Sequence, residues 1–360
     1  MNKIALLCDP HFGARGDSND FHEYFKMFYD EIFFPYLIVN NIQTVILLGD
    51  AFDRRKFVNI NSLYQARGYF FNKFKKLGIN LLILLGNHDV FYKDTLRVNS
   101  PQLLLEDIKN VKIIMDFETI MVNDVPIDII PWLCEENTKT ISESIKESKS
   151  QICLGHFEIN GFEMDRGNVF KGGNFEKNDL NKYDMVITGH FHHKSDDNHI
   201  YYLGTPYQLT WSDYGDPRGF HIFDVNTRSI EFIENPRQMF HKINYDDSVQ
   251  NEEYWKEQDL TMYKNTYIKI VVLNKSNPFL FDSLLDRLEK IGAYDIGIVE
   301  DFTIVDGMEE IENTKLDQTQ DTISILNKWI DNQEFSIDVD KLKAKMREIY
   351  IEAINVGKNE

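Results

Sequence analysis

The stretch Leu81-Leu-Ile-Leu-Leu-Gly-Asn87-His88-Asp89 begins as an uninterrupted apolar run and ends in a glycine followed by three polar side chains. Other segments with a similar pattern, in which an apolar run leads to aspartate or histidine, are residues 4–11, 45–50, 152–156 and 185–192. Short apolar runs that end in this way are typical of strands buried on both faces. In an open α/β sheet, ligands bind beyond the carboxyl ends of the strands, so we expect these polar groups to gather at one edge of one sheet.

The polar groups at these strand ends are carboxylates, one amide and several imidazoles. Mixed oxygen and imidazole donors suit divalent transition metals, and two such ions side by side act on phosphoryl groups. A single aspartate or histidine after a glycine is more often structural than a ligand. Five such endings within the first 192 residues are hard to reach by chance, so the set predicts the metal centre of a hydrolase.

These residues, in this order, resemble the calcineurin-like metallophosphoesterase family. The family pattern is D-x-H, G-D-x-x-D, G-N-H-[D/E], G-H and G-H-x-H, and all of it is present between residues 9 and 192. Two further stretches, residues 127–137 and 204–220, look like SbcD-type recombination nucleases, and among these like the nuclease subunits that T-even bacteriophages encode. The likeness runs nearly end to end and loosens after about residue 240.

The resemblance implies an α/β fold, with a four-layer α/β/β/α metallophosphoesterase sandwich, a small α+β capping domain and C-terminal helices. It divides the chain into a metallophosphoesterase nuclease domain at residues 1–236, a capping, DNA-binding domain at 237–300, an acidic linker at 301–320 and a helical ATPase-binding region at 321–360.

The spacing of apolar residues agrees with this outline. Residues 19–40 and 62–76 repeat apolar side chains at helical intervals and lie between predicted parallel strands, where crossover helices occur. Residues 200–203 and 219–225 are expected to complete the second half of the sandwich. Further elements are expected as a helix at 138–148, strands at 266–273 and 295–299, and a helix at 277–291.

The resemblance also implies the metal ligands. Asp50 would bridge two metal ions, because a carboxylate offers an oxygen to each. One ion would be held by Asp9, His11 and His192, and the other by Asn87, His156 and His190. The nuclease relatives imply manganese, with magnesium, iron and zinc as the alternatives.

His88 follows the ligand Asn87 but has no expected ligand role of its own. An imidazole can donate a proton near neutral pH, so His88 is the predicted general acid for the leaving oxygen. The alternative is a structural histidine beside the centre. Asp53 stands where phosphoprotein phosphatases carry an aspartate that orients this histidine, whereas archaeal nucleases carry a histidine there. We therefore predict that Asp53 orients His88.

The charge of the chain bears on its substrate. The formal net charge is −19, while a protein that binds nucleic acid usually presents a basic face. Bound cations and a partner subunit would offset part of this acidity. Arg15, Arg54, Arg55 and Lys56 are candidates for contact with DNA phosphates, with a solvated surface run as the alternative for the last three.

The C-terminal region suggests a protein partner. Leu342, Met346, Ile349 and Ile354 recur at helical spacing beyond an acidic stretch, and the resemblance implies that they bind an SbcC-type coiled-coil ATPase. The alternative is that this helix packs against its own domain. A homodimer within a heterotetramer is also expected, built on residues 62–76 and 96–108. Their apolar side chains, which a buried crossover helix would equally need, include Phe70, Phe74, Leu103, Leu104 and Leu105.

Cys8, Cys134 and Cys153 form an odd set without zinc-type spacing. We expect reduced, buried thiols in a cytoplasmic protein, in the host cell if a phage encodes it. The N-terminus enters a predicted strand almost at once, so no signal peptide is expected. No apolar run approaches transmembrane length.

The resemblance implies a manganese-dependent DNA nuclease subunit that acts with the ATPase in recombination, DNA end processing and DNA degradation. Its activities would be those of a 3′→5′ double-strand exonuclease and a single-strand endonuclease. The alternative is a two-metal phosphatase or cyclic-nucleotide phosphodiesterase on the same fold, which the acidic composition favours slightly. A metal-free scaffold would have lost ligands, and this chain keeps all of them.

Overall fold

A computed structural model describes residues 2–165, 168–170, 173, 175–300, 342 and 345. The chain divides into two compact units, Met1–Glu300 and Asp301–Glu360. The predicted acidic linker and, apart from Leu342 and Lys345, the predicted C-terminal helices lie outside the described residues. Within the part of the chain that is described, no helix is long and apolar enough to span a membrane.

The first large sheet contains β1 Lys3–Leu7, β2 Thr44–Leu48, β3 Asn80–Leu84, β4 Val111–Ile114, β13 Gly219–Asp224 and β14 Ser229–Glu234. Their order is β14-β13-β1-β2-β3-β4. The strands from β1 to β4 run parallel, and β13 pairs antiparallel with both β1 and β14. The first three apolar runs of the sequence are therefore neighbouring parallel strands, whose carboxyl ends meet at one edge.

The second large sheet contains β5 Glu118–Val122, β6 Val125–Ile130, β7 Ile152–His156, β10 Met185–Gly189, β11 Ser195–Asp196 and β12 Ile200–Tyr202. Their order is β11-β12-β10-β7-β6-β5. The central strands β6, β7, β10 and β12 are parallel, and β5 and β11 close the two edges as antiparallel strands.

The expectation that all five apolar runs lie in one sheet is wrong. The first three form β1, β2 and β3 of the first sheet, whereas β7 and β10 belong to the second. A strand buried on both faces shows the same apolar run in either sheet, so the pattern cannot separate the two. The placement of residues 219–225 in the second half of the sandwich is also wrong, because β13 pairs with β1 in the first sheet, with Asp224 opposite Lys3.

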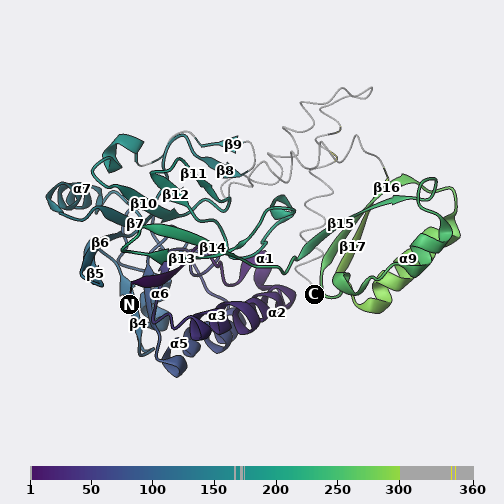
Figure 1. Cartoon of the computed structure of the whole chain (residues 1–360), viewed down its shortest axis with the longest axis horizontal. Helices are drawn as coiled ribbons and strands as arrows, with labels where there is room; N and C mark the ends of the chain where they lie inside the picture. Colours follow the sequence, from purple (N-terminus) through teal and green to yellow (C-terminus); the bar gives the residue numbers. More distant parts are fainter. Residues whose placement is uncertain are drawn as a thin grey trace. The chain divides into compact units, whose positions relative to one another are not determined.

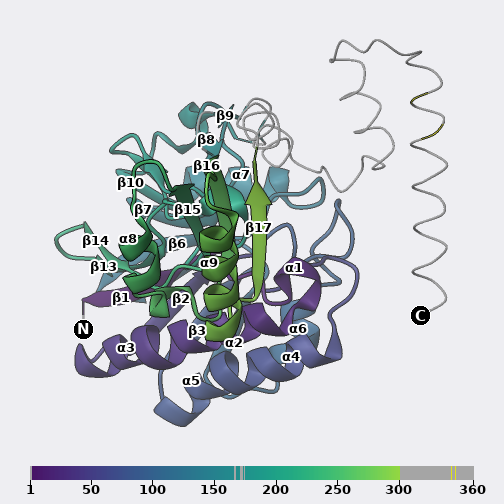
Figure 2. The same ribbon diagram turned by 90° about the vertical axis from the view of Figure 1, so that its right-hand side faces the viewer.

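The two sheets pack face to face and helices cover their outer faces, which gives the predicted four-layer α/β/β/α sandwich (Figures 1 and 2). Side chains along β1 alternate between layers. Ile4 and Leu6 enter the core between the sheets, whereas Ala5 and Leu7 enter the core under the first set of helices. A third core lies on the outer face of the second sheet, beneath helix α7 Thr138–Glu147.

The predicted crossover helices are present, and each contains a π-helical turn. The first comprises α2 Asn19–Phe28, the turn η1 Tyr29–Phe33 and α3 Phe34–Val39. The second comprises α4 Ile60–Ala66, the turn η2 Arg67–Phe71 and α5 Asn72–Leu77. The Asn59 side chain caps the start of α4 by accepting hydrogen bonds from backbone N–H groups of its first turn. Both crossovers bury aromatic rings against the first sheet, so their spacing is explained by packing.

Residues 240–299 form a smaller α/β unit with a core of its own. Its parallel sheet has the order β15-β16-β17, with β15 Phe240–Asp246, β16 Tyr267–Asn274 and β17 Asp295–Val299. Helix α9 Pro278–Ile291 is capped by Asn277, whose side chain accepts a hydrogen bond from the backbone N–H of Leu280. The sequence analysis missed β15 and helix α8 Glu252–Glu257, because histidine, lysine and asparagine interrupt the apolar pattern of β15.

The remaining short elements are α1 Ala14–Asp17, α6 Ser100–Leu105, β8 Glu163–Asp165, β9 Asn168–Val169 and the 3₁₀ turns η3 Lys177–Leu180, η4 Trp211–Asp213 and η5 Thr261–Tyr263. The three cysteines are buried and free, as predicted.

Candidate metal centre

Four predicted ligands, each just beyond a strand end, have a left-handed backbone conformation. Asp9, His11, Asp50 and His190 have φ angles of 48°, 45°, 52° and 89°. This left-handed region costs a non-glycine residue of order 1–3 kcal/mol, and it persists only where the surroundings enforce it, commonly at functional sites. These residues follow β1, β2 and β10, so the backbone strain coincides with the predicted centre.

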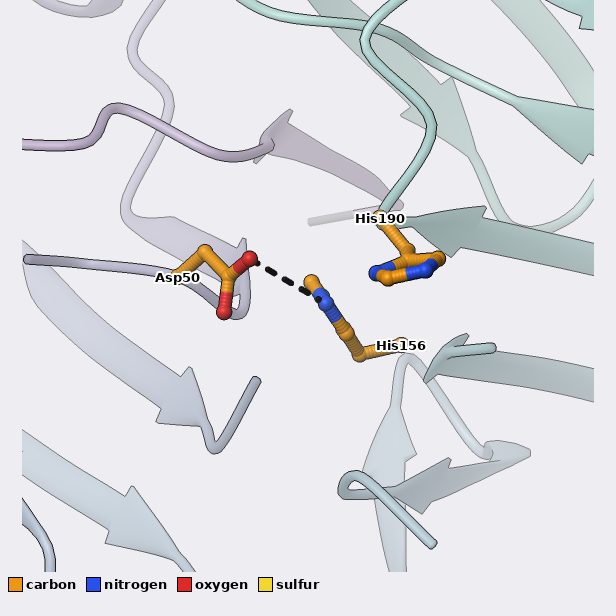
Figure 3. Close-up of side chains that lie close together, drawn as sticks. All are labelled: Asp50, His156 and His190. Atoms are coloured by element: carbon orange, nitrogen blue, oxygen red, sulfur yellow. Dashed lines mark ion pairs between the residues drawn. The ribbon is translucent and has the colours of Figure 1, made fainter. Parts of the chain in front are cut away.

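One donor cluster draws on both sheets. Asp50 after β2, His156 at the end of β7 and His190 after β10 lie close together (Figure 3). Asp50 Oδ2 lies 3.5 Å from His156 Nε2. Asn87 Oδ1 lies 2.9 Å from both His156 Nε2 and His190 Nδ1. The structure therefore brings together the residues predicted for one metal ion.

The backbone orients His156. Its Nδ1 donates a hydrogen bond to the carbonyl oxygen of Leu48 at 2.8 Å, since a carbonyl can only accept, and Nε2 is left facing Asp50 and Asn87. Burial disfavours the charged ring, but the carboxylates of Asp50 and Asp9 raise the pKa of His156 to about 9. Without metal the ring holds a proton on Nε2, which a bound cation would displace.

The other donor cluster contains Asp9, His11 and Asp50. His192 lies beside it, with its Nε2 atom 3.0 Å from His11 Nε2. Burial and the neighbouring His88 lower the pKa of His11 to about 3, and burial together with His11 lowers the pKa of His192 well below its ordinary value. Two neutral rings in this arrangement present nitrogen atoms to the same small space, which fits a shared cation.

Asp50 belongs to both clusters. Its Oδ2 lies 3.5 Å from His156 Nε2 and 3.9 Å from His11 Nε2, while its Oδ1 accepts from the backbone N–H of His88 at 2.7 Å. Burial opposes ionisation, but the neighbouring histidines, His156 and His88 foremost, hold the pKa of Asp50 well below its usual value. An ionised carboxylate between two donor groups is suited to a bridging role.

Glycines before the ligands permit this close approach. A Cβ atom at Gly86 would lie 2.1 Å from Asp50 Oδ1, and one at Gly49 would lie 2.3 Å from His156 Nδ1. Gly49 also has a φ of 91°. The Gly-Asp and Gly-Asn-His sequences thus reflect the space needed where strand ends of two sheets converge. The donor types and this cradle together fit a pair of metal ions.

Asp89, to which the sequence analysis assigns no role, connects two ligand loops. Its Oδ1 accepts from the backbone N–H of Ala51, and its Oδ2 accepts from the backbone N–H of Gly86, both at 2.9 Å. Asp89 is fully buried, and burial together with the charge of Asp50 raises its pKa to about 7. The side chain fixes the loop after β2 against the loop after β3. Its place directly after Asn-His in the motif was the available signal.

Asp53 contacts His88 through its main chain. The backbone carbonyl of Asp53 accepts from His88 Nδ1 at 2.5 Å, whereas its carboxylate lies 3.5 Å from His11 Nδ1. The carboxylate therefore lies near a predicted metal ligand, but His11 Nδ1 has no hydrogen-bond partner among the described residues. Because a carbonyl can only accept, Nδ1 of His88 carries a proton, and Nε2 is the ring nitrogen left for chemistry.

The basic candidates differ in their surroundings. Arg54 pairs with Asp17 at 3.1 Å and lies over the Phe57 ring at 4.9 Å. Arg55 is half-buried; burial lowers its pKa, and the charge of Asp50 opposes that shift, which places Arg55 within electrostatic reach of the centre. Arg15 and Lys56 are exposed. Arg55 is thus the basic candidate that the structure connects to the predicted ligands.

Two side chains beside the centre were missed as site residues. The Trp132 ring, just beyond β6, lies 5.3 Å from the His190 ring and 5.9 Å from the His156 ring. Glu158 Oε1 lies 3.3 Å from His190 Nε2. The sequence marks Trp132 only through the resemblance of residues 127–137, and it gives no signal for Glu158.

The chain is similar to several known proteins. The family description "Calcineurin-like phosphoesterase" matches residues 3–194. "Exonuclease subunit 1" of Enterobacteria phage T4 is 31% identical over 354 residues, which cover 98% of this chain and 99% of that protein. A subunit of the nuclease SbcCD from Staphylococcus saprophyticus is 22% identical over 58% of this chain and 54% of its own length. Among solved structures, a novel archaeal phosphodiesterase covers 65% of this chain and 99% of its own at 17% identity, with a TM-score of 0.32, a likeness too distant to carry an argument.

Proposed function

The chain belongs to the calcineurin-like phosphoesterase family, and on that premise we propose that it is the nuclease subunit of a DNA-degrading complex. Hydrolysis of phosphoesters at a centre of two divalent metal ions is the chemistry of this family. One observation supports DNA as the phosphoester substrate, namely the similarity to a phage exonuclease subunit over 98% of the chain. The paired donor clusters that share Asp50 support the same reaction class.

In this proposal Asp9, His11 and His192 would hold one ion, Asn87, His156 and His190 would hold the other, and Asp50 would be a ligand common to both. When bound, two divalent ions neutralise the phosphoryl charge and lower the pKa of a water molecule. The carbonyl of Leu48 orients the His156 ring from behind, and the Asp53 carboxylate lies 3.5 Å from His11 Nδ1. The resemblance to the nuclease relatives is the basis for proposing manganese, and the mixture of oxygen and imidazole donors is compatible with it.

His88 supplies the proton for the leaving oxygen. Its Nδ1 is committed to the Asp53 carbonyl, and its backbone N–H is held by Asp50 Oδ1. Its ring lies edge-on to the His11 ring at 4.9 Å between centroids, so it borders the donor cluster. The protonated Nε2 is then the acid.

The test is release of nucleotides from end-labelled linear duplex DNA by metal-free protein to which manganese or magnesium is added. We expect mononucleotides from the 3′ ends in manganese, cleavage of single-stranded circles, and neither product without metal. Phosphomonoesters and 3′,5′-cyclic nucleotides serve as comparison substrates. If manganese-loaded protein hydrolyses those compounds and leaves DNA intact, the chain is a phosphatase or cyclic-nucleotide phosphodiesterase instead.

We also propose that an SbcC-type coiled-coil ATPase binds the stripe Leu342, Met346, Ile349 and Ile354. Leu342 is helical and half-buried, while the other three lie outside the described residues. The support comes from the sequence pattern and from the two nuclease relatives, each of which is a subunit of a larger enzyme by name.

Truncation after Gly307 is expected to abolish this association. Each buried aliphatic anchor contributes roughly 1.5–3 kcal/mol, so removing four weakens binding by more than about 100-fold even after association costs. Metal content and hydrolysis of bis(p-nitrophenyl) phosphate should be unchanged, because the donor clusters lie in the unit Met1–Glu300. Calorimetric titration with the ATPase measures the loss. Full-strength binding by the truncated chain would place the partner surface elsewhere.

The expected homodimer needs a surface with exposed apolar side chains. Phe70, Phe74 and Leu105 are completely buried in the chain's own core, so they are not available to a second copy. Exposed apolar side chains on or near these helices are Ile60 at 85%, Tyr64 at 74% and Leu103 at 69%. Arg67, which follows α4, donates to the Leu104 carbonyl in α6 at 2.8 Å, which ties the two helices together. We propose that this face pairs with its equivalent in a second copy.

Replacing both Ile60 and Tyr64 by aspartate should convert the dimer to a monomer. Loss of two central apolar contacts costs roughly 2 kcal/mol or more each, so together they raise the dissociation constant by about 1,000-fold or more. Light scattering at micromolar concentration gives the mass. Val249→Asp, at a residue 76% exposed in another part of the chain, is the matched control and should remain dimeric. A monomeric parent protein would contradict the dimer itself.

A further inference from the structure

The side chain of a buried arginine donates a hydrogen bond to the main chain of a predicted metal ligand. Arg218, in the Asp-Pro-Arg-Gly-Phe stretch that leads into β13, is 5% exposed. Its Nη1 donates to the backbone carbonyl of His192, and also to Thr205 Oγ1 at 2.9 Å. Its Nη2 pairs with Asp213 Oδ1 at 2.7 Å and with Asp216 Oδ2 at 2.8 Å. The two carboxylates neutralise and fix the guanidinium, which in turn fixes the ligand-bearing loop.

The His192 carbonyl accepts a second hydrogen bond from the segment of residues 204–218. The backbone N–H of Thr205 donates to it at 3.2 Å. Asp216 Oδ2 also lies 2.9 Å from Nδ1 of the next residue, His193. The Gly-His-Phe-His loop is therefore held by the backbone carbonyl of its last histidine and by the side chain of the residue that follows.

Tyr207, from the same segment, holds the opposite side of the cluster. Its ring is fully buried and stacks on Phe25 at 4.0 Å between centroids. Its hydroxyl donates to the carbonyl oxygen of Pro10 at 2.7 Å. Pro10 stands between Asp9 and His11, the two other ligands assigned to the same metal ion. Residues 204–218 thus contact the backbone carbonyl of His192 and that of Pro10, which lies between the other two ligands of the same site.

This segment is itself anchored outside the sandwich. Gln208 Oε1 accepts from the backbone N–H groups of Met239 and Phe240, at 2.8 and 3.0 Å, and its Nε2 donates to the Asp213 carbonyl at 3.0 Å. Phe240 is the first residue of β15. The segment therefore has fixed points on each side, as a rigid support for ligands requires.

We propose that Arg218 and Tyr207 are positioning residues for the metal site formed by Asp9, His11 and His192, and that they set its affinity separately from that of the second site. Asp9 and His11 have strained φ angles of 48° and 45°, so their ligand geometry depends on outside restraint. Residues that orient ligands from behind commonly change metal affinity by about 10–100-fold. The inference rests on the ligand assignment proposed above.

The experiment is a calorimetric titration of metal-free full-length protein with manganese alone, using Arg218→Lys and Tyr207→Phe. Lysine keeps the charge but cannot reach the carbonyl, the hydroxyl and both carboxylates together. We expect about 10–100-fold weaker binding at one site and an unchanged second site. A solely structural role predicts a lower melting temperature with no difference between the sites.

Two variants match these changes away from the centre. Arg67→Lys alters an arginine that also binds a backbone carbonyl and a carboxylate, those of Leu104 and Asp107. Tyr183→Phe removes a buried hydroxyl that donates to Asp128 Oδ2 at 2.8 Å. Both should keep the parental affinity at each metal site.

The His192→Ala variant tests the ligand assignment on which the positioning role of Arg218 and Tyr207 depends. If His192→Ala still binds two manganese ions at parental affinity, the ligand assignment itself fails. If it loses one ion while Arg218→Lys and Tyr207→Phe bind both as the parent does, the positioning role alone is overturned. Equal weakening at both sites overturns it as well. Should Arg218→Lys fail to fold, Tyr207→Phe decides the question, because it removes one hydroxyl and leaves the ring packing intact.

Discussion

Asp50→Ala is expected to empty both metal sites and to abolish hydrolysis. Asp50 is the residue common to the two donor clusters, with Oδ2 at 3.5 Å from His156 Nε2 and 3.9 Å from His11 Nε2. Its removal leaves a buried group of histidines without their central negative charge. Each metal ion contributes several kcal/mol to transition-state stabilisation, so the rate should fall by more than about 10⁴-fold.

The measurement is the metal content of purified Asp50→Ala by plasma emission spectroscopy, with DNA degradation measured in parallel. Asp128→Ala is the control, because Asp128 is equally buried but accepts from Thr119 Oγ1 and Tyr183 OH in the middle of β6. It should retain two ions per chain, whatever its melting temperature. Two ions retained by Asp50→Ala would refute the bridging role.

The strand-end motifs could be read from the sequence because their physical causes are local. An apolar run that meets glycine and then a carboxylate or imidazole specifies a buried strand whose carboxyl end carries a ligand group. The structure forms a strand at each of the five runs, and the side chains that follow them lie in the two donor clusters or beside them. The helical spacing of residues 19–40 and 62–76 likewise predicted both crossover helices, including the residues that adopt π-helical turns.

Pairing between distant segments could not be read in this way. The assignment of β7 and β10 to the second sheet, and of β13 to the first, depends on which buried strand lies beside which. The contacts of Asp89 and Asp53 depend on groups of other loops, namely the Ala51 N–H for the Asp89 carboxylate and the His88 side chain for the Asp53 carbonyl. No local pattern encodes those contacts. Arg218 reaches a residue 26 positions earlier in the chain, so its contact with His192 is visible only in three dimensions.

His88→Asn is expected to keep both metal ions but to slow DNA cleavage by about 10²–10⁴-fold, the usual contribution of a general acid. Asparagine retains an N–H group that can replace the donation from Nδ1 to the Asp53 carbonyl, which spans 2.5 Å in the parent. The backbone N–H that binds Asp50 Oδ1 is also retained. What disappears is the proton on Nε2, so the variant isolates acid catalysis from loop structure.

The leaving group provides the deciding comparison. An alkoxide oxygen of DNA departs poorly without a proton, whereas p-nitrophenolate departs readily on its own, so loss of an acid should affect the two substrates differently. We expect His88→Asn to hydrolyse bis(p-nitrophenyl) phosphate within about tenfold of the parental rate while its DNA cleavage falls by the full amount. Metal content and DNA binding should match those of the parent. Equal losses on both substrates would mean that His88 supports the metal centre, and an unchanged rate on DNA would mean that the leaving oxygen takes its proton from another group.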